Sequence, residues 1–142
     1  MIRALIGLAV VTASTAVAST CDELPAILIV QDRSGSMGSA PAGGTVSATN
    51  PSKWSISQTE IPALAWEFAN RLRFGVMLYP ATTNCSAGNV VSPISYDPAD
   101  VQKIYEASTT KGSTPTATSL DAARVHLLGA KLTTRKYVLL IT

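Results

Sequence analysis

Residues 26–37 read AILIVQDRSGSM, and this stretch decides the fold. Its first five residues, 26–30, form a continuous apolar run, which is typical of a strand buried on both faces of a parallel sheet. Asp32 follows almost at once, and then come two serines, Ser34 and Ser36, separated by a glycine. The stretch therefore predicts a buried strand that leads into a loop rich in oxygen ligands.

Strands and helices alternate along the rest of the chain. We expect helices at 54–70, 98–107 and 116–128, and strands at 73–79, 90–94 and 137–141, the last of them buried. This alternation predicts a three-layer, doubly wound α/β sheet, mostly parallel, with its strands in the order 3-2-1-4. In such a sheet the first and fourth strands are neighbours, and ligands bind beyond the carboxyl ends of the strands.

Proline and capping residues mark the predicted helices. Pro62 removes one backbone hydrogen bond from the first helix, so a kink or a restart is expected there. Asp97 followed by Pro98 is a helix start, Thr116 is interpreted as the N-cap of the last helix, and Gly129 ends that helix.

Composition limits the function. The 142 residues carry a formal net charge of +2, too balanced for a protein that binds nucleic acid through its phosphates. A hydrophobic fraction of 46% with 14% charged residues excludes a fully disordered chain and fits one domain with a large core.

The amino terminus has the pattern of an export signal. Arg3 precedes a short apolar run, and residues 16–18 read AVA, an A-x-A cleavage pattern. We expect a signal peptide at 1–18, a short segment at 19–25 and one domain at 26–142. A retained membrane anchor is the alternative. Cleavage would place the protein outside the cytoplasm, secreted, periplasmic or on the cell surface, with no membrane-spanning segment left.

Asp32, Ser34 and Ser36 point three oxygens at one centre, with Gly35 permitting the tight turn. Oxygen ligands select hard cations such as Mg²⁺, Mn²⁺ or Ca²⁺. A second hydroxyl cluster at 112–116, which contains Thr114, precedes the last helix. In the order 3-2-1-4 both loops lie above the same crevice.

Taken together, the D-x-S-x-S loop, the G-x-T loop at 112–114 and the final V-L-L-I-T strand resemble the von Willebrand factor A-type domain. The likeness covers 26–142, and the strand at 73–79 looks like exported bacterial members. The family's hallmark is the metal-ion-dependent adhesion site. The resemblance implies that the hydroxyls of Ser34, Ser36 and Thr114 approach the metal, and that Asp32 binds it directly or through water.

The sequence departs from this family in two ways. Members carry a further Asp after the fourth strand, where this sequence has Thr142 as its last residue, and they add two strands with covering helices. We therefore expect an amino-terminal fragment of a longer domain. Its fourth strand would be an apolar open edge, so the isolated piece is expected to be unstable or to associate.

Neutral hydroxyls and few carboxylates leave much of a cation's charge unneutralised, so an Asp or Glu of a partner protein can bind it. The expected function is metal-dependent protein binding, without catalysis. A serine hydrolase with Ser36 as nucleophile, His126 as base and Asp32 as orienter is one alternative, although the elbow G-x-S-x-G is absent. A scaffold domain without metal is the other.

Six further residues have open interpretations. Cys21 and Cys85 either form a disulfide or remain apart. Arg33 and Lys111 are interpreted as solvated, with the steering of an acidic partner as the alternative. The two tryptophans, Trp54 and Trp66, are expected in the core or at helix edges.

Overall fold

The computed structural model describes residues 23–142. The predicted signal peptide and Cys21 lie outside these residues, so cleavage and the pairing of Cys21 with Cys85 stay predictions; Cys85 itself is exposed. The elements are β1 (Ala26–Asp32), the 3₁₀ turn η1 (Gly35–Gly38), α1 (Lys53–Glu67), β2 (Arg73–Tyr79), β3 (Asn89–Ser95), α2 (Pro98–Ala107), α3 (Thr116–Gly129) and β4 (Lys136–Ile141). Every predicted helix and strand is present.

The sheet has the order β3-β2-β1-β4, which confirms the predicted neighbours. Strand β1 is parallel to both β2 and β4, whereas β3 is antiparallel to β2. In this register Asp32 lies opposite Tyr79, and Gln31 lies opposite Ile141. The carboxyl ends of β1, β2 and β4 therefore meet at one end of the sheet.

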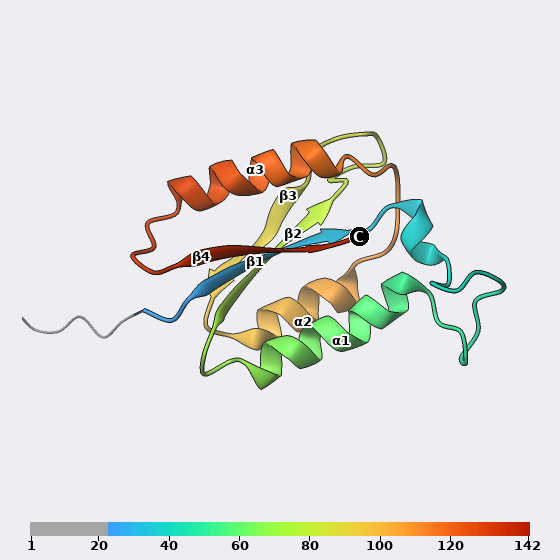
Figure 1. Cartoon of the computed structure of the whole chain (residues 1–142), viewed down its shortest axis with the longest axis horizontal. Coiled ribbons are helices and arrows are strands. Elements are labelled where there is room, and N and C mark those ends of the chain that lie inside the picture. The colour runs from blue at the N-terminus through green and yellow to red at the C-terminus, as the bar shows by residue number, and fades with distance from the viewer. Residues whose placement is uncertain (1–22) are drawn as a thin grey trace, which may run out of the picture.

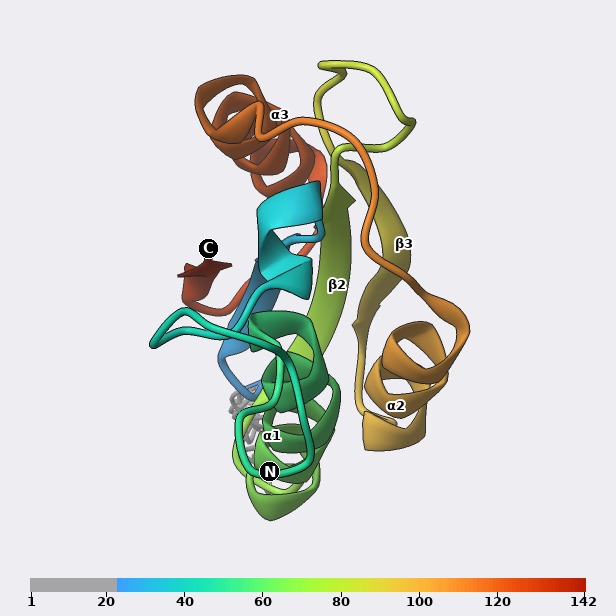
Figure 2. The ribbon, with the colours of Figure 1, turned by 90° about the vertical axis from the view of Figure 1, so that its right-hand side faces the viewer.

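Helices cover both faces of the sheet, so the predicted three layers are confirmed. Figure 1 shows α3 on one side of the sheet and α1 with α2 on the other, and Figure 2 shows the same layers from the end. Alternation along β1 explains the split: Ile29 packs into the core under α1 and α2, while Leu28 and Val30 pack towards α3. One strand thus supplies two apolar cores.

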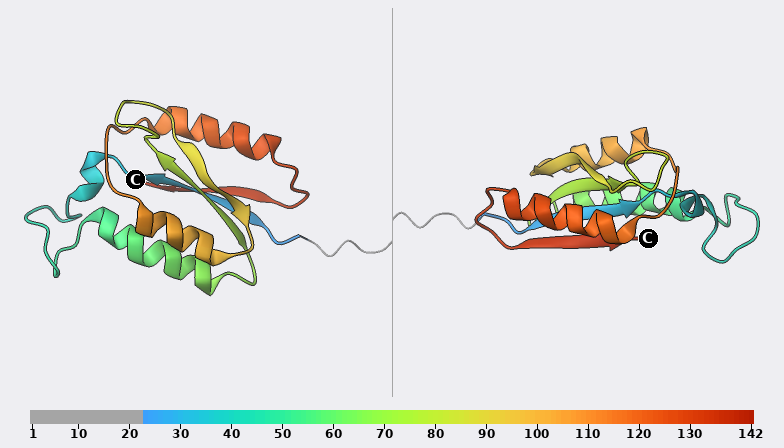
Figure 3. Two further views of the ribbon diagram at one scale, coloured as in Figure 1. Left: turned by 180° about the vertical axis from the view of Figure 1, so that it is seen from behind. Right: turned by 90° about the horizontal axis from the view of Figure 1, so that it is seen from above.

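The segment from Ser39 to Ser52 projects away from the body, beyond the carboxyl ends of the strands (Figure 3). The turn η1 precedes this segment and buries Met37. In the described part of the chain, no helix is both long and apolar enough to cross a membrane.

Strand β4 corrects one prediction. It pairs with β1 on one side only, which confirms the predicted open edge, but its predicted burial is wrong, because Tyr137, Val138 and Leu140 are 47%, 41% and 37% exposed. On the neighbouring helix α3, Leu128 is 70% exposed. These side chains have the apolar character of a core, but in residues 23–142 nothing covers them.

The helices bear on three more predictions, of which the one for Thr116 is wrong. Helix α1 continues through Pro62 instead of restarting there. Thr116 is the first residue of α3 rather than its N-cap, which is Pro115, and the Thr116 hydroxyl donates to the Tyr79 hydroxyl at 3.4 Å. Trp54 is buried, whereas Trp66 is 54% exposed and donates its Nε1–H to Gln102.

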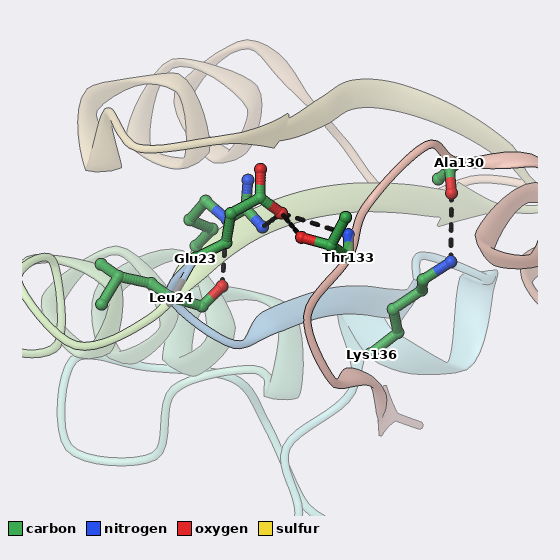
Figure 4. Close-up of polar contacts among 6 residues, drawn as sticks. Glu23, Leu24, Ala130, Thr133 and Lys136 are labelled. Carbon is green, nitrogen blue, oxygen red and sulfur yellow. Dashed lines mark hydrogen bonds and ion pairs between the residues drawn. The ribbon is translucent and has the colours of Figure 1, made fainter. Parts of the chain in front are cut away.

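The opposite end of the sheet is fixed by Glu23. Figure 4 shows its carboxylate beside Thr133, whose backbone N–H and hydroxyl donate to Oε2 at 3.2 and 3.0 Å. Arg73 forms an ion pair with the same oxygen at 3.1 Å and donates from Nε to the Leu24 carbonyl. Nearby, the Lys136 ammonium donates to two carbonyls at the end of α3. These contacts tie the chain ahead of β1 to β2 and to the turn between α3 and β4.

Candidate metal centre

Asp32 is the last residue of β1, and its carboxylate lies under the loop that follows. The residue is 1% exposed. Its Oδ1 accepts from the Ser34 backbone N–H at 2.7 Å, and its Oδ2 accepts from the Thr142 hydroxyl at 3.1 Å. Two neighbouring strands therefore orient this one carboxylate.

Ser34 and Ser36 lie directly above Asp32. Their hydroxyl oxygens are 3.1 Å apart and share a hydrogen bond; Ser34 is buried and Ser36 is exposed. The turn η1 sets this spacing, because the Met37 backbone N–H donates to the Ser34 carbonyl and the Met37 side chain is buried in the core. The structure thus brings the two serine hydroxyls together and joins Asp32 to Ser34 through the Ser34 backbone N–H, while metal binding by these residues stays a prediction.

Thr114 lies in a loop that is bonded to the serine loop through the backbone. The Lys111 N–H donates to the Arg33 carbonyl at 2.6 Å, and the Gly35 N–H donates to the Gly112 carbonyl at 3.1 Å. Thr114 itself is exposed at the rim. The structure thus places its loop beside the site, while the bonds that join the two loops come from other residues.

Arg33 is not the solvated side chain that the sequence led us to expect. Its Nε donates to the Pro80 carbonyl at 3.0 Å and its Nη2 donates to the Ala81 carbonyl at 2.9 Å. Its backbone N–H donates to the Tyr79 carbonyl at 2.7 Å. Partial burial lowers the pKa of the guanidinium, which nevertheless stays charged. Arg33 therefore holds the loop after β2 against the serine loop.

Two residues of the site were missed at the level of sequence. Thr142 directly follows the strand beside β1. A hydroxyl at this carboxyl end of the sheet is a sequence signal for a contact with Asp32, and the structure shows that contact. The contacts of Arg33 to Pro80 and Ala81 cross 47 and 48 residues of sequence, and no local pattern indicates them.

The oxygen atoms present fit a hard divalent cation. In an octahedral magnesium shell, with bonds of about 2.0–2.1 Å, adjacent ligand oxygens lie about 2.9 Å apart, against about 3.3–3.7 Å for calcium. The Ser34–Ser36 hydroxyl separation of 3.1 Å lies midway between about 2.9 Å and the lower calcium value, so it is compatible with either ion. Residues 23–142 contain no group of three or more His, Cys, Asp or Glu side chains suited to a metal. An ion here would therefore rest mainly on hydroxyl oxygens.

The hydrolase alternative requires His126 next to Ser36. His126 lies in the last turn of α3, where its carbonyl accepts from the Ala130 N–H, just ahead of β4. Ser36 lies beyond the other end of the strands. The structure places the two residues at opposite ends of the sheet and forms no catalytic pair from them.

A comparison with family models found no match to the sequence, and neither did one with curated proteins. Solved structures do match. The PilB minor pilin from Streptococcus sanguinis superposes with a TM-score of 0.68 at 16% identity, over 84% of this chain and 29% of that protein. The vWF domain of the type V pili tip protein Mfa5 from Porphyromonas gingivalis gives 0.61 at 17%, over 81% and 36%.

The SpRpn10 VWA domain also matches, with a TM-score of 0.61 at 13% identity over 84% of this chain and 60% of that one. The chain thus spans only about a third of the lengths of PilB and of the Mfa5 domain. At these identities the likeness concerns the fold. With its strand order, its two helical layers and these structural matches, the chain has the von Willebrand factor A-type fold.

Proposed function

We propose that this chain is a protein-binding module that uses a divalent cation, Mg²⁺ or its substitute Mn²⁺, to bind an acidic side chain of a partner protein. The observation that carries the proposal is the cluster of Asp32, Ser34 and Ser36 at the carboxyl end of β1. The loop that contains Thr114 is bonded to its side. Asp32, Ser34, Ser36 and Thr114 would hold the ion.

The charge of this cluster favours an acidic partner. Asp32 supplies a single negative charge, and serine and threonine hydroxyls supply none. A bound divalent cation would keep a net positive charge and attract a carboxylate from outside. Ser36 and Thr114 are exposed, so the partner reaches the site from the solvent side. When the partner's carboxylate binds the ion, no covalent bond of the partner is broken. This interaction therefore supports binding rather than catalysis.

We also propose that the module acts outside the cytoplasm, in adhesion. Residues 1–18 have the pattern of an export signal. Two proteins with the same fold are named as a minor pilin and a type V pili tip protein. These names support the proposal by analogy of fold, which by itself does not assign a function.

The proposal is tested with Mn²⁺ and acetate as probes. The folded chain is titrated with Mn²⁺ while water proton relaxation is followed, and acetate is then added as the simplest carboxylate. We expect enhanced relaxation on binding, a decrease when acetate displaces metal-bound water, and full reversal by EDTA. The variant Thr114→Ala weakens Mn²⁺ binding about tenfold or more, and the control Ser113→Ala in the same loop leaves it unchanged.

Two results would count against the proposal. Absence of Mn²⁺ binding to the folded chain supports the scaffold alternative. Binding of Mn²⁺ that is equally strong in Thr114→Ala and in the wild type removes Thr114 from the site.

A further inference from the structure

Within the core under α1 and α2, one pair of polar side chains stands out. The Tyr105 hydroxyl, on α2, donates to Oε1 of Gln31 at 2.8 Å, and both residues are 0% exposed. Their surroundings are apolar, with Ile29, Val101 and Trp54 in the same core cluster. A buried polar pair of this kind adds little net stability over apolar residues of equal shape, whereas loss of one partner is costly. Its presence therefore calls for a role besides packing.

Gln31 joins this pair to the candidate metal centre. It directly precedes Asp32, and its side-chain Nε2 donates to the Asp32 backbone carbonyl. The same peptide unit carries the Arg33 N–H, which donates to the Tyr79 carbonyl at 2.7 Å. The peptide between Asp32 and Arg33 is thus held from both sides, by Gln31 at its oxygen and by β2 at its nitrogen. This peptide sets the direction in which the chain leaves β1 for Ser34 and Ser36.

Tyr105 is itself fixed firmly enough to act as an anchor. Its ring stacks on Trp54 of α1, with centroids 5.8 Å apart and planes 18° apart, and its carbonyl accepts from Gln58 at 2.9 Å. Burial raises the pKa of the Tyr105 hydroxyl far above its ordinary value, so it stays a protonated donor over the whole working range of pH. Trp54 also belongs to the core cluster that contains Met37, the buried residue of η1.

We infer that Tyr105 and Gln31 are positioning residues, a buried connection from helix α2 to the peptide that aims the serine loop at the metal. The inference rests on the proposed function for its consequence, the metal affinity. Its structural part concerns the order of the loop at 33–38 and holds for the metal-free chain.

Three variants of the full chain test this inference. Tyr105→Phe removes only the hydroxyl, and Tyr105→Phe combined with Gln31→Met removes both polar groups and restores an apolar core. Val101→Ala is the control, because Val101 is also on α2 and 0% exposed but makes no polar contact. Amide hydrogen exchange of Ser34 and Met37 is measured with EDTA present, and Mn²⁺ affinity is measured by calorimetry.

We expect Tyr105→Phe to exchange these two amides about fivefold faster and to bind Mn²⁺ about fivefold more weakly, which corresponds to the loss of one hydrogen bond. The double variant also loses the bond from Gln31 to the Asp32 carbonyl, so its defects are at least as large. The double variant keeps these defects even though its thermal stability recovers. Val101→Ala lowers the free energy of unfolding. After correction for this loss, the amides of the loop exchange at the wild-type rate, and the Mn²⁺ affinity equals that of the wild type. If Tyr105 and Gln31 only stabilised the core, loop exchange and Mn²⁺ affinity would change in proportion to the loss of stability. Val101→Ala would then show the defects, and the double variant would lose them as its stability recovers.

The inference is overturned by unchanged exchange in Tyr105→Phe and in the double variant, or by equal loop defects in Val101→Ala. Absence of Mn²⁺ binding in the wild type contradicts the proposed function instead. In that case the exchange measurement still decides whether Tyr105 and Gln31 position the loop.

Discussion

Gly112 lies where three loops approach one another: its own loop, the serine loop after β1 and the loop after β2. Its φ is +70°, and an added Cβ would lie 2.7 Å from the Thr83 carbonyl oxygen and 2.8 Å from the Pro80 ring. Its own carbonyl accepts from the Gly35 N–H in the serine loop. A side chain at this position therefore strains the backbone and also separates the loops around the candidate metal centre.

The substitution Gly112→Ala is expected to destabilise the fold by about 2–4 kcal/mol, since it combines backbone strain with a steric clash. Gly43→Ala is the matched control: its φ is +78°, but nothing lies within 4 Å of its Cβ position. The control costs only about 1 kcal/mol. Chemical denaturation of both variants measures the difference, and equal losses would show that the loop contact contributes nothing.

Arg33 permits a second test at the residue scale. Arg33→Gln removes the charged donors to the Pro80 and Ala81 carbonyls, so the loop after β2 should open more often. Faster amide exchange in residues 81–88 and a loss of about 1–2 kcal/mol are expected. The control Arg124→Gln removes an exposed guanidinium paired with Asp121 and should cost less than about 0.5 kcal/mol. Identical exchange in both variants contradicts the role given to Arg33.

At the scale of elements, β4 presents an apolar edge to solvent in residues 23–142. Unpaired backbone groups on such an edge invite pairing with another chain. We predict concentration-dependent association of the chain, measured by sedimentation. Val138→Lys places a charge on the edge strand and should shift the protein towards monomer, while Val125→Lys, at an exposed position on α3, should not. A monodisperse wild-type monomer contradicts this prediction.

Glu23 fixes the element β1 at its amino end, and its effect depends on pH. The Thr133 hydroxyl first, then the Thr133 N–H and Arg73, lower the pKa of Glu23 below its ordinary value of 4.5. Because the folded-state pKa is the lower one, the stabilisation is full above pH 4.5 and disappears as the pH falls through the folded-state value.

Thermal unfolding between pH 6 and about pH 3 checks this sign. The difference in stability between the wild type and Glu23→Gln should be constant near pH 6 and shrink below pH 4.5. A difference that grows as the pH falls would contradict the assignment.

The positions of the helices and strands could be predicted from the sequence, but which of their side chains are covered by other elements could not. The apolar run at 26–30 and the helical spacing of Trp54, Ile61 and Ala65 report which side chains prefer a core, and this preference fixes strand and helix positions. The same preference led to the wrong prediction that the side chains of β4 are buried, although its place at an open edge was predicted. The tie between Gln31 and Tyr105 spans 74 residues and has no local signature.

The candidate site was predictable to the extent that it is local. Asp32, Ser34 and Ser36 lie within five residues, so their convergence follows from one turn. The backbone bonds from Lys111 and Gly112, and the contact of Thr142 with Asp32, exist only because three loops meet at one end of the sheet. Sequence placed the loops near one another through the strand order, and only the structure supplies their bonds.

The whole molecule has two unlike ends. The carboxyl ends of β1, β2 and β4 carry the hydroxyl cluster, and the amino end of β1 is bound through Glu23 to Arg73 and Thr133. The chain therefore enters the domain at the end opposite the candidate metal centre.

Metal binding by the hydroxyl cluster is the central claim, and calorimetry with Mn²⁺ on the folded chain tests it most directly. Ser36→Ala removes one hydroxyl of the cluster, and Ser39→Ala removes an exposed hydroxyl just past η1. We predict one Mn²⁺ bound per wild-type chain, an affinity about tenfold or more lower in Ser36→Ala, and no change in Ser39→Ala. A folded wild-type chain that takes up no Mn²⁺, or an unchanged affinity in Ser36→Ala, would contradict the account.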